Sequence, residues 1–204
     1  MLEIIEHADD AAVAEWLHGR LAAALAGSEA PVAITVPGGS TPFPILENVA
    51  AMPLAWRRLT VWPGDDREVP EDHPASNTGK IRALLEPVGA EVVALSVMEQ
   101  VPHFALAWLG MGGDGHIASL FPNTDPRPDD PLKVRRLTPD PLPPEAPFDR
   151  ITLTIPALLD ADEIMFVIRG AEKRALFEAA ARGENDLPIA RLLAAARQPV
   201  TCFT

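Results

Sequence analysis

A glycine-rich stretch at residues 112–116 places a carboxylate and an imidazole two positions apart. It reads Gly-Gly-Asp-Gly-His, so glycines on both sides of Asp114 permit the sharp backbone path that brings Asp114 and His116 together. A carboxylate beside a histidine fixes the imidazole tautomer and stabilises its protonated form, which a general base requires. The same histidine also fits a purely structural role in a loop. Its position directly after an expected strand favours catalysis.

A second candidate lies at residues 38–42, which read Gly-Gly-Ser-Thr-Pro. Two glycines let the backbone approach a ligand closely, Thr41 suits a helix N-cap, and Pro42 suits the first helical position. A helix starting there presents free N–H groups to an anion such as a phosphate. A plain strand-to-helix turn has the same sequence features, and the Gly-Lys-Ser/Thr ending of a nucleotide-binding P-loop is absent.

Two further groups of charged residues follow expected strands. Cations cluster at residues 169–174, where they oppose the helix dipole unless an anion binds; alternatively, their long side chains reach solvent or pair with Glu172. The other group is Asp-Asp-Arg at residues 65–67, which is either a solvated turn or an anchor. As an anchor, Arg67 would steady a phosphate or a developing oxyanion.

The elements around these segments alternate between strands and helices. Expected strands cover 31–36, 59–62, 91–96, 104–109, 151–155 and 164–168, with a further strand at 133–138 and an edge strand at 200–203. Expected helices cover 11–26, 42–51, 77–85, 171–181 and 187–196. This alternation predicts one α/β domain over 1–204, with a mainly parallel sheet, helices on both faces, and a proline-rich loop or lid at about 122–149. Ligands bind beyond the carboxyl ends of such strands, so the loops at 37–42, 63–67 and 110–116 are expected to form one site.

Composition excludes several classes of protein. The 204 residues carry 17 basic and 29 acidic side chains, a net charge of −12, which argues against nucleic-acid and anionic-membrane partners. The start of the chain lacks a signal-peptide pattern, and no stretch is apolar enough to span a bilayer. A single cysteine and five histidines without metal-binding spacing predict no disulfide and no metal, in a cytoplasmic protein. We expect a monomer or a small homo-oligomer.

Taken together, these loops resemble the 6-phosphogluconolactonase family, which is related to the glucosamine-6-phosphate deaminases. The matching segments occur in family order at 38–42, 64–70, 73–77, 109–122, 150–154 and 170–173. The most specific is the run Asp-Gly-His-Ile-Ala-Ser-Leu-Phe-Pro at residues 114–122.

The resemblance implies a modified Rossmann-like fold that needs no cofactor. It also implies hydrolysis of the phosphorylated sugar lactone 6-phosphogluconolactone to 6-phosphogluconate in the pentose phosphate pathway. His116 would then be the acid/base, assisted by Asp114, and Arg67 would hold substrate and stabilise charge. The residues implied for the 6-phosphate are Gly38, Gly39, Ser40, Thr41 and Lys173. Arg169 is added from its position alone, and Asp65, Asp66 and Asn77 are further site candidates.

Departures from the family pattern keep other functions open. Pro37, Asp66 and Gly113 stand where the family commonly has serine, glutamate and proline, and the segment between Leu85 and Phe104 is short and without an expected helix. A diverged sugar-phosphate binder, or a lactonase for another phosphorylated sugar acid, is therefore an alternative. An amino-sugar-phosphate deaminase is disfavoured, because Arg67 and Phe121 replace that branch's tyrosine and glutamate.

Overall fold

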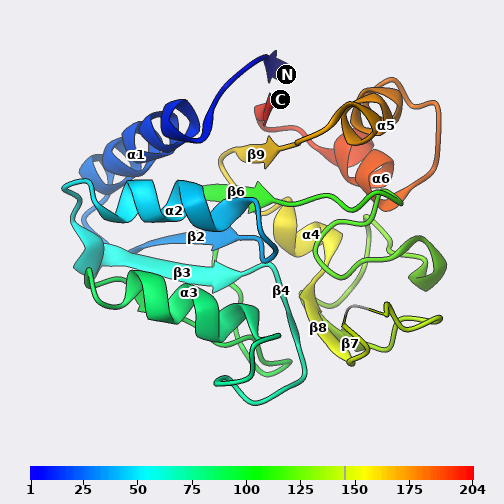
Figure 1. The fold of residues 1–204 in the computed structure, drawn as a ribbon, viewed down its shortest axis with the longest axis horizontal. Coiled ribbons are helices and arrows are strands. Elements are labelled where there is room, and N and C mark those ends of the chain that lie inside the picture. Colours follow the sequence, from blue (N-terminus) through cyan, green and yellow to red (C-terminus); the bar gives the residue numbers. More distant parts are fainter. Residues whose placement is uncertain (145) are drawn as a thin grey trace.

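A seven-stranded parallel sheet forms the centre of the computed structural model, which describes residues 1–144 and 146–204 (Figure 1). The strand order is β1-β10-β9-β6-β2-β3-β5. The bounds are β1 Leu2–Ile5, β2 Val32–Val36, β3 Leu59–Pro63, β5 Glu91–Val92, β6 Leu106–Leu109, β9 Ile164–Val167 and β10 Val200–Phe203. The α/β class and the mainly parallel sheet are confirmed.

Helices cover both faces of this sheet, as the sequence predicts. Helices α1 (Asp10–Gly27), α2 (Pro42–Ala50) and α3 (Asn77–Leu85) pack on one face, and α4 (Ile155–Leu158), α5 (Ala171–Ala181) and α6 (Pro188–Ala195) pack on the other. Each face of the sheet has its own hydrophobic core, and side chains that alternate along a strand contribute to both. In β9, Met165 packs with the first group of helices and Phe166 with the second. A strand buried on both faces reads as a continuous apolar run, which is why β9 and β6 were recognisable in the sequence.

Several expected strands differ in place or length. The strand expected at 151–155 is β8 (Arg150–Leu153), which leaves the main sheet and pairs antiparallel with β4 (Asp65–Arg67) and β7 (Val134–Leu137). The segment 200–203 is not an edge, because β10 lies between β1 and β9. The sequence pattern does not predict β1, which is short and half exposed. The predicted strand at 91–96 is longer than β5, which ends at Val92. No helix follows β5 before β6, in agreement with the expectation for that short segment.

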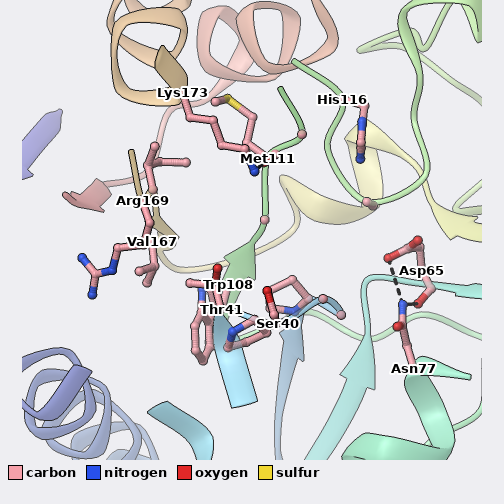
Figure 2. Close-up of a pocket in the computed structure, with 18 of the residues that line it drawn as sticks. Ser40, Thr41, Asp65, Asn77, Trp108, Met111, His116, Val167, Arg169 and Lys173 are labelled. Atoms are coloured by element: carbon pink, nitrogen blue, oxygen red, sulfur yellow. Dashed lines mark hydrogen bonds between the residues drawn. The ribbon is translucent and has the colours of Figure 1, made fainter. Parts of the chain in front are cut away.

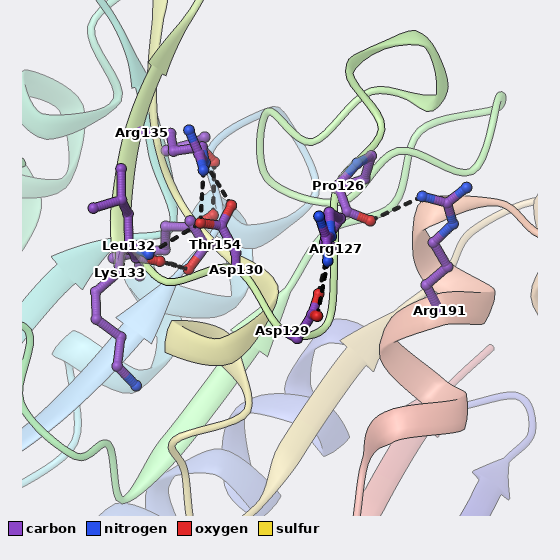
Figure 3. A network of polar contacts seen from close by, with 11 residues as sticks. Pro126, Arg127, Asp129, Asp130, Leu132, Lys133, Arg135, Thr154 and Arg191 are labelled. Atoms are coloured by element: carbon purple, nitrogen blue, oxygen red, sulfur yellow. Dashed lines mark hydrogen bonds and ion pairs between the residues drawn. The ribbon is translucent and has the colours of Figure 1, made fainter.

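The proline-rich segment is fastened to the body by polar contacts (Figure 3). Arg191 of α6 donates from Nη1 to Asp125 Oδ1 at 2.6 Å and to the Pro126 carbonyl at 3.0 Å. Farther along, the Thr154 hydroxyl donates to the Leu132 carbonyl at 2.7 Å, at the start of α4. These contacts connect the segment to the start of α4 and to α6. No helix in the described part of the chain is long and apolar enough to cross a membrane.

One surface cluster predicts a pH-dependent contribution to stability. The ring of His103 lies between two carboxylates, with Nδ1 2.8 Å from Asp160 Oδ1 and Nε2 2.9 Å from Asp162 Oδ1, while Lys133 also contacts Asp160. Both ring nitrogens must carry a proton to donate to both acids, and these hydrogen bonds raise the pKa of His103. The cluster therefore stabilises the fold fully below the unfolded pKa of about 6.5, and the contribution is lost as pH rises through the higher folded value.

Thermal unfolding of wild type and His103→Gln at pH 6 and pH 9 measures this contribution. The variant is expected to lose stability at pH 6 and little at pH 9. Because the His103 side chain is 55% exposed, solvent screening limits the loss to about 1 kcal/mol or less. His7→Gln, at a side chain that is 90% exposed, is the control. An equal loss for His103→Gln at both pH values would contradict the proposed role of protonation.

Candidate active site

A pocket of about 320 Å³ opens at the carboxyl ends of β2, β3, β6 and β9. Its wall includes the loop after β2 (Gly38 to Thr41), Asp65 and Arg67 of β4, and His116 of the loop after β6. Residues on both sides of the α5 start complete it, namely Arg169 and Lys173. The structure therefore brings together the three loops that the sequence placed in one site, and adds the start of α5 to them.

His116 and Asp114 form a hydrogen-bonded pair beside this pocket. The Nδ1 atom of His116 lies 2.6 Å from Asp114 Oδ1, and the His116 amide donates to the same oxygen at 3.2 Å. These contacts with His116 lower the pKa of Asp114 to about 2, so its carboxylate is ionised at every pH near neutrality. The Phe121 ring packs against the imidazole with centroids 4.7 Å apart. One nitrogen of His116 is therefore oriented by Asp114, and Nε2 is the nitrogen left for chemistry.

The glycines around the pair are required by close contacts. A Cβ atom at Gly112 would lie 2.1 Å from His116 Cε1, and a Cβ at Gly115 would lie 2.8 Å from Leu187 Cδ1. Gly115 also has φ of +79°, a conformation that L side chains rarely adopt. The Gly115 carbonyl accepts from the Ile189 amide at 3.2 Å, which joins the loop to the start of α6. The turn that holds His116 is thus fixed from both sides by backbone that only glycine fits.

The residues of β4 face in alternate directions, as in any strand. Asp65 and Arg67 line the pocket, whereas Asp66 lies outside it. Asp66 accepts hydrogen bonds from the backbone amides of Asn77 at 2.6 Å and Thr78 at 2.9 Å, so its carboxylate serves the first turn of α3. The structure therefore gives Asp66 a capping position rather than one beside a ligand.

Asp65 lies in a buried polar group at the floor of the pocket. Its Oδ2 accepts from the Ser119 hydroxyl at 2.5 Å, and burial raises the pKa of the carboxyl group. Arg67 donates from Nη1 to the Ala75 carbonyl at 2.9 Å, while its buried Nε has no hydrogen-bond partner among the described residues. Ser119 was not singled out from the sequence, although it belongs to the run at 114–122. Its position three residues after His116 is the sequence feature from which Ser119 could have been recognised.

The groups suited to an anion lie on one side of the pocket. In Figure 2, Lys173 and Arg169 lie opposite His116 and Asp65, with Ser40 and Thr41 between the two sets. Lys173 Nζ donates to the Met111 carbonyl at 3.2 Å, and Arg169 pairs with Asp10 at 2.9 Å. Helix α2 begins at Pro42 as expected, although the Thr41 side chain makes no capping hydrogen bond. Lys173 and Arg169 thus lie at one end of the pocket, His116 lies at the other, and the start of α2 lies between them.

Some charged residues near the pocket take no part in it. Arg174 pairs with Glu6 and with Glu178, rather than with Glu172, which the alternative interpretation of the basic cluster at 169–174 names as the partner. The pocket also contains apolar side chains that the sequence did not indicate, including Trp108, Met111 and Val167. No group of three or more His, Cys, Asp or Glu side chains in the described part of the chain is arranged to hold a metal ion.

Comparisons with known proteins identify the family of this chain. The family model described as glucosamine-6-phosphate isomerases/6-phosphogluconolactonase matches residues 7–90 and 88–201. A Pseudomonas aeruginosa protein named 6-phosphogluconolactonase is 35% identical over 207 residues, which cover 90% of this chain and 84% of that protein. A protein of the same name from Mesorhizobium japonicum is 34% identical over 193 residues, which cover 83% and 80%.

A solved structure shows the same fold over the whole chain. The crystal structure of 6-phosphogluconolactonase from Thermotoga maritima superimposes with a TM-score of 0.83. The match covers 100% of this chain and 99% of the other at 24% sequence identity. At that identity the structural similarity establishes the fold alone. The evidence from sequence comes from the relatives that are 34% and 35% identical.

Proposed function

The chain belongs to the glucosamine-6-phosphate isomerase/6-phosphogluconolactonase family, and from that membership we propose that it is a 6-phosphogluconolactonase. It hydrolyses 6-phospho-D-glucono-1,5-lactone to 6-phospho-D-gluconate in the pentose phosphate pathway. The observation that carries the proposal is the division of the pocket, with the Asp114–His116 pair at one end, Lys173 and Arg169 at the other, and the start of α2 between them.

In the proposed mechanism, the two ends of the pocket do different work. The glycines of the loop after β2, with Ser40, Thr41 and Lys173, bind the 6-phosphate, and Arg169 adds positive charge nearby. Anchoring the phosphate orients the lactone carbonyl toward His116, so remote binding energy is used to position the reacting atoms.

The chemical step needs one base and one stabiliser of negative charge. His116 Nε2 takes a proton from water as the water oxygen attacks the lactone carbonyl, and Asp114 holds the imidazolium that forms. Arg67 stabilises the oxyanion of the tetrahedral intermediate. The carbonyl then re-forms, the ring C–O bond breaks, and His116 returns its proton to the departing ring oxygen. A lactone is an activated ester, so no covalent enzyme intermediate is needed.

The isomerase branch of the family is the less suitable alternative. The Phe121 side chain stands where that branch has a glutamate, and its ring lies against His116. An apolar ring cannot transfer a proton, so the ring-opening step of an aldose phosphate has no carboxylate at this position.

The direct test is hydrolysis of freshly generated 6-phosphogluconolactone above its spontaneous rate. The product is followed with 6-phosphogluconate dehydrogenase and excess cofactor. Saturable turnover that greatly exceeds the spontaneous rate is expected. No acceleration, together with tight binding of 6-phosphogluconate, would instead identify a sugar-phosphate binder.

Lys173→Ala is expected to weaken binding of phosphorylated ligands. The variant loses one charge-assisted hydrogen bond, so KM for 6-phosphogluconolactone should rise by about 10- to 100-fold, with a smaller change in kcat. Hydrolysis of unphosphorylated glucono-1,5-lactone should be nearly unchanged.

Arg174→Ala is the matched control, because this neighbouring cation of α5 pairs with Glu6 and Glu178 outside the pocket. Steady-state kinetics on both lactones checks the prediction. An unchanged KM in Lys173→Ala would remove Lys173 from the phosphate site.

A further inference from the structure

Asn77, the first residue of α3, contacts two separate walls of the pocket. Its side-chain Nδ2 donates to the Asp65 carbonyl at 2.9 Å, which holds the strand that carries Asp65 and Arg67. Its amide group lies against Gly38 in the loop after β2, where a Cβ atom at Gly38 would be only 2.2 Å from Asn77 Oδ1. Asn77 is 1% exposed and lines the pocket. One buried side chain therefore touches both the phosphate end and the catalytic end.

The orientation of this amide is fixed. Turning it over would set Oδ1 against the Asp65 carbonyl oxygen at hydrogen-bond distance, which is repulsive. In the present orientation Oδ1 is buried without a hydrogen-bond partner among the described residues. A buried acceptor without a partner costs about 1–3 kcal/mol, so its presence needs an explanation.

Close packing of the Asn77 amide against Gly38 explains this buried oxygen. The Asn77 oxygen is closed to solvent, so a substrate hydroxyl cannot reach it in this geometry and the residue does not read the sugar ring directly. The flat amide instead sets how closely the Gly38 backbone approaches Asp65. Gly38 is the residue type that this approach requires, because any side chain would overlap the amide.

We propose that Asn77 is a positioning residue that fixes the spacing between the phosphate-binding loop at 38–41 and the β4 residues Asp65 and Arg67. With this spacing, a ligand held by its phosphate presents its lactone carbonyl to His116 and Arg67. This inference rests on the proposed function. A displacement of about 1 Å in such a site costs about 100-fold in rate, so loss of the Asn77 side chain between the two ends should have a measurable effect on the rate.

The experiment compares ligands that use one end of the pocket with a ligand that uses both. Binding of inorganic phosphate, gluconate and 6-phosphogluconate is measured by calorimetry for wild type, Asn77→Ala and Asn77→Asp. The aspartate keeps the shape of the side chain but has no donor for the Asp65 carbonyl. Both variants are expected to bind phosphate within about threefold of wild type and to lose about tenfold or more of the extra affinity that 6-phosphogluconate has over phosphate. In kinetics, kcat/KM should fall for the phosphorylated lactone and much less for glucono-1,5-lactone.

Thr78→Ala is the matched control, because Thr78 is the next residue of α3, is equally buried, and lies outside this pocket. It should keep the wild-type ratio of affinities. A second approach changes the other partner of the contact. Gly38→Ala should reduce the ratio of 6-phosphogluconate affinity to phosphate affinity in wild type, and should have a smaller effect in the Asn77→Ala background. If the Asn77 variants fold poorly, Gly38→Ala by itself tests the same contact.

Two results would overturn the proposal. One is an unchanged affinity ratio in folded Asn77 variants, and the other is an equal loss in Thr78→Ala, which would show a merely structural role. The binding measurements do not depend on turnover. Wild type that binds 6-phosphogluconate but does not hydrolyse the lactone would contradict the proposed function and leave this test intact.

Discussion

His116→Ala is expected to lower kcat for 6-phosphogluconolactone hydrolysis by about 10²–10⁴-fold, the range typical of a lost general base. The alanine cannot accept the proton of the attacking water or return a proton to the ring oxygen. Affinity for 6-phosphogluconate should change little, because Lys173, which we propose binds the phosphate, lies opposite His116 in the pocket. The loss should therefore appear in kcat, with KM close to that of wild type.

The measurement uses wild type, His116→Ala and His18→Ala under the same coupled assay. His18 lies on α1, where it contacts the Pro53 carbonyl away from the pocket. Its variant controls for the loss of an imidazole in general. Hydrolysis by His116→Ala at the wild-type rate would show that another group activates the water. Calorimetry with 6-phosphogluconate separates lost catalysis from lost binding.

Gly112→Ala is expected to inactivate the enzyme almost as severely, although it leaves His116 in place. The added Cβ would lie 2.1 Å from His116 Cε1 and 2.2 Å from Nδ1, with Asp114 Oδ1 at 2.8 Å. These distances are far inside van der Waals contact, so the imidazole must move away from Asp114. A shift of about 1 Å in a reacting group costs about 100-fold in kcat.

Gly113→Ala is a matched control for this prediction. A Cβ atom at Gly113 meets nothing within 4 Å, and the residue has no positive φ. This variant should keep close to wild-type kcat, and both variants should unfold at similar temperatures because the loop is at the surface. Equal activity of Gly112→Ala and Gly113→Ala would mean that the observed His116 position is not the reactive one.

The class of fold and the segments that form the site could be predicted from local patterns in the sequence. Buried strands such as β6 and β9 are continuous apolar runs, and helices such as α1 show an apolar face, so local periodicity was sufficient to find them. Because parallel strands end at the same edge of a sheet, the order of strands and loops also predicted that 37–42, 63–67 and 110–116 meet. The pairing of Asp114 with His116 is local as well, since only Gly115 lies between them in the chain.

Only the tertiary structure decided which way each candidate faces. Asp65, Asp66 and Arg67 are adjacent charged residues, yet pairing of β4 with β8 makes their side chains alternate, which turns Asp66 toward α3 and the other two toward the pocket. The contact of Asn77 with Gly38, and the separate roles of Lys173 and Arg174, likewise depend on residues that are distant in the chain. Strand pairing and side-chain contacts are long-range, and a local pattern carries no information about the partner that it will meet.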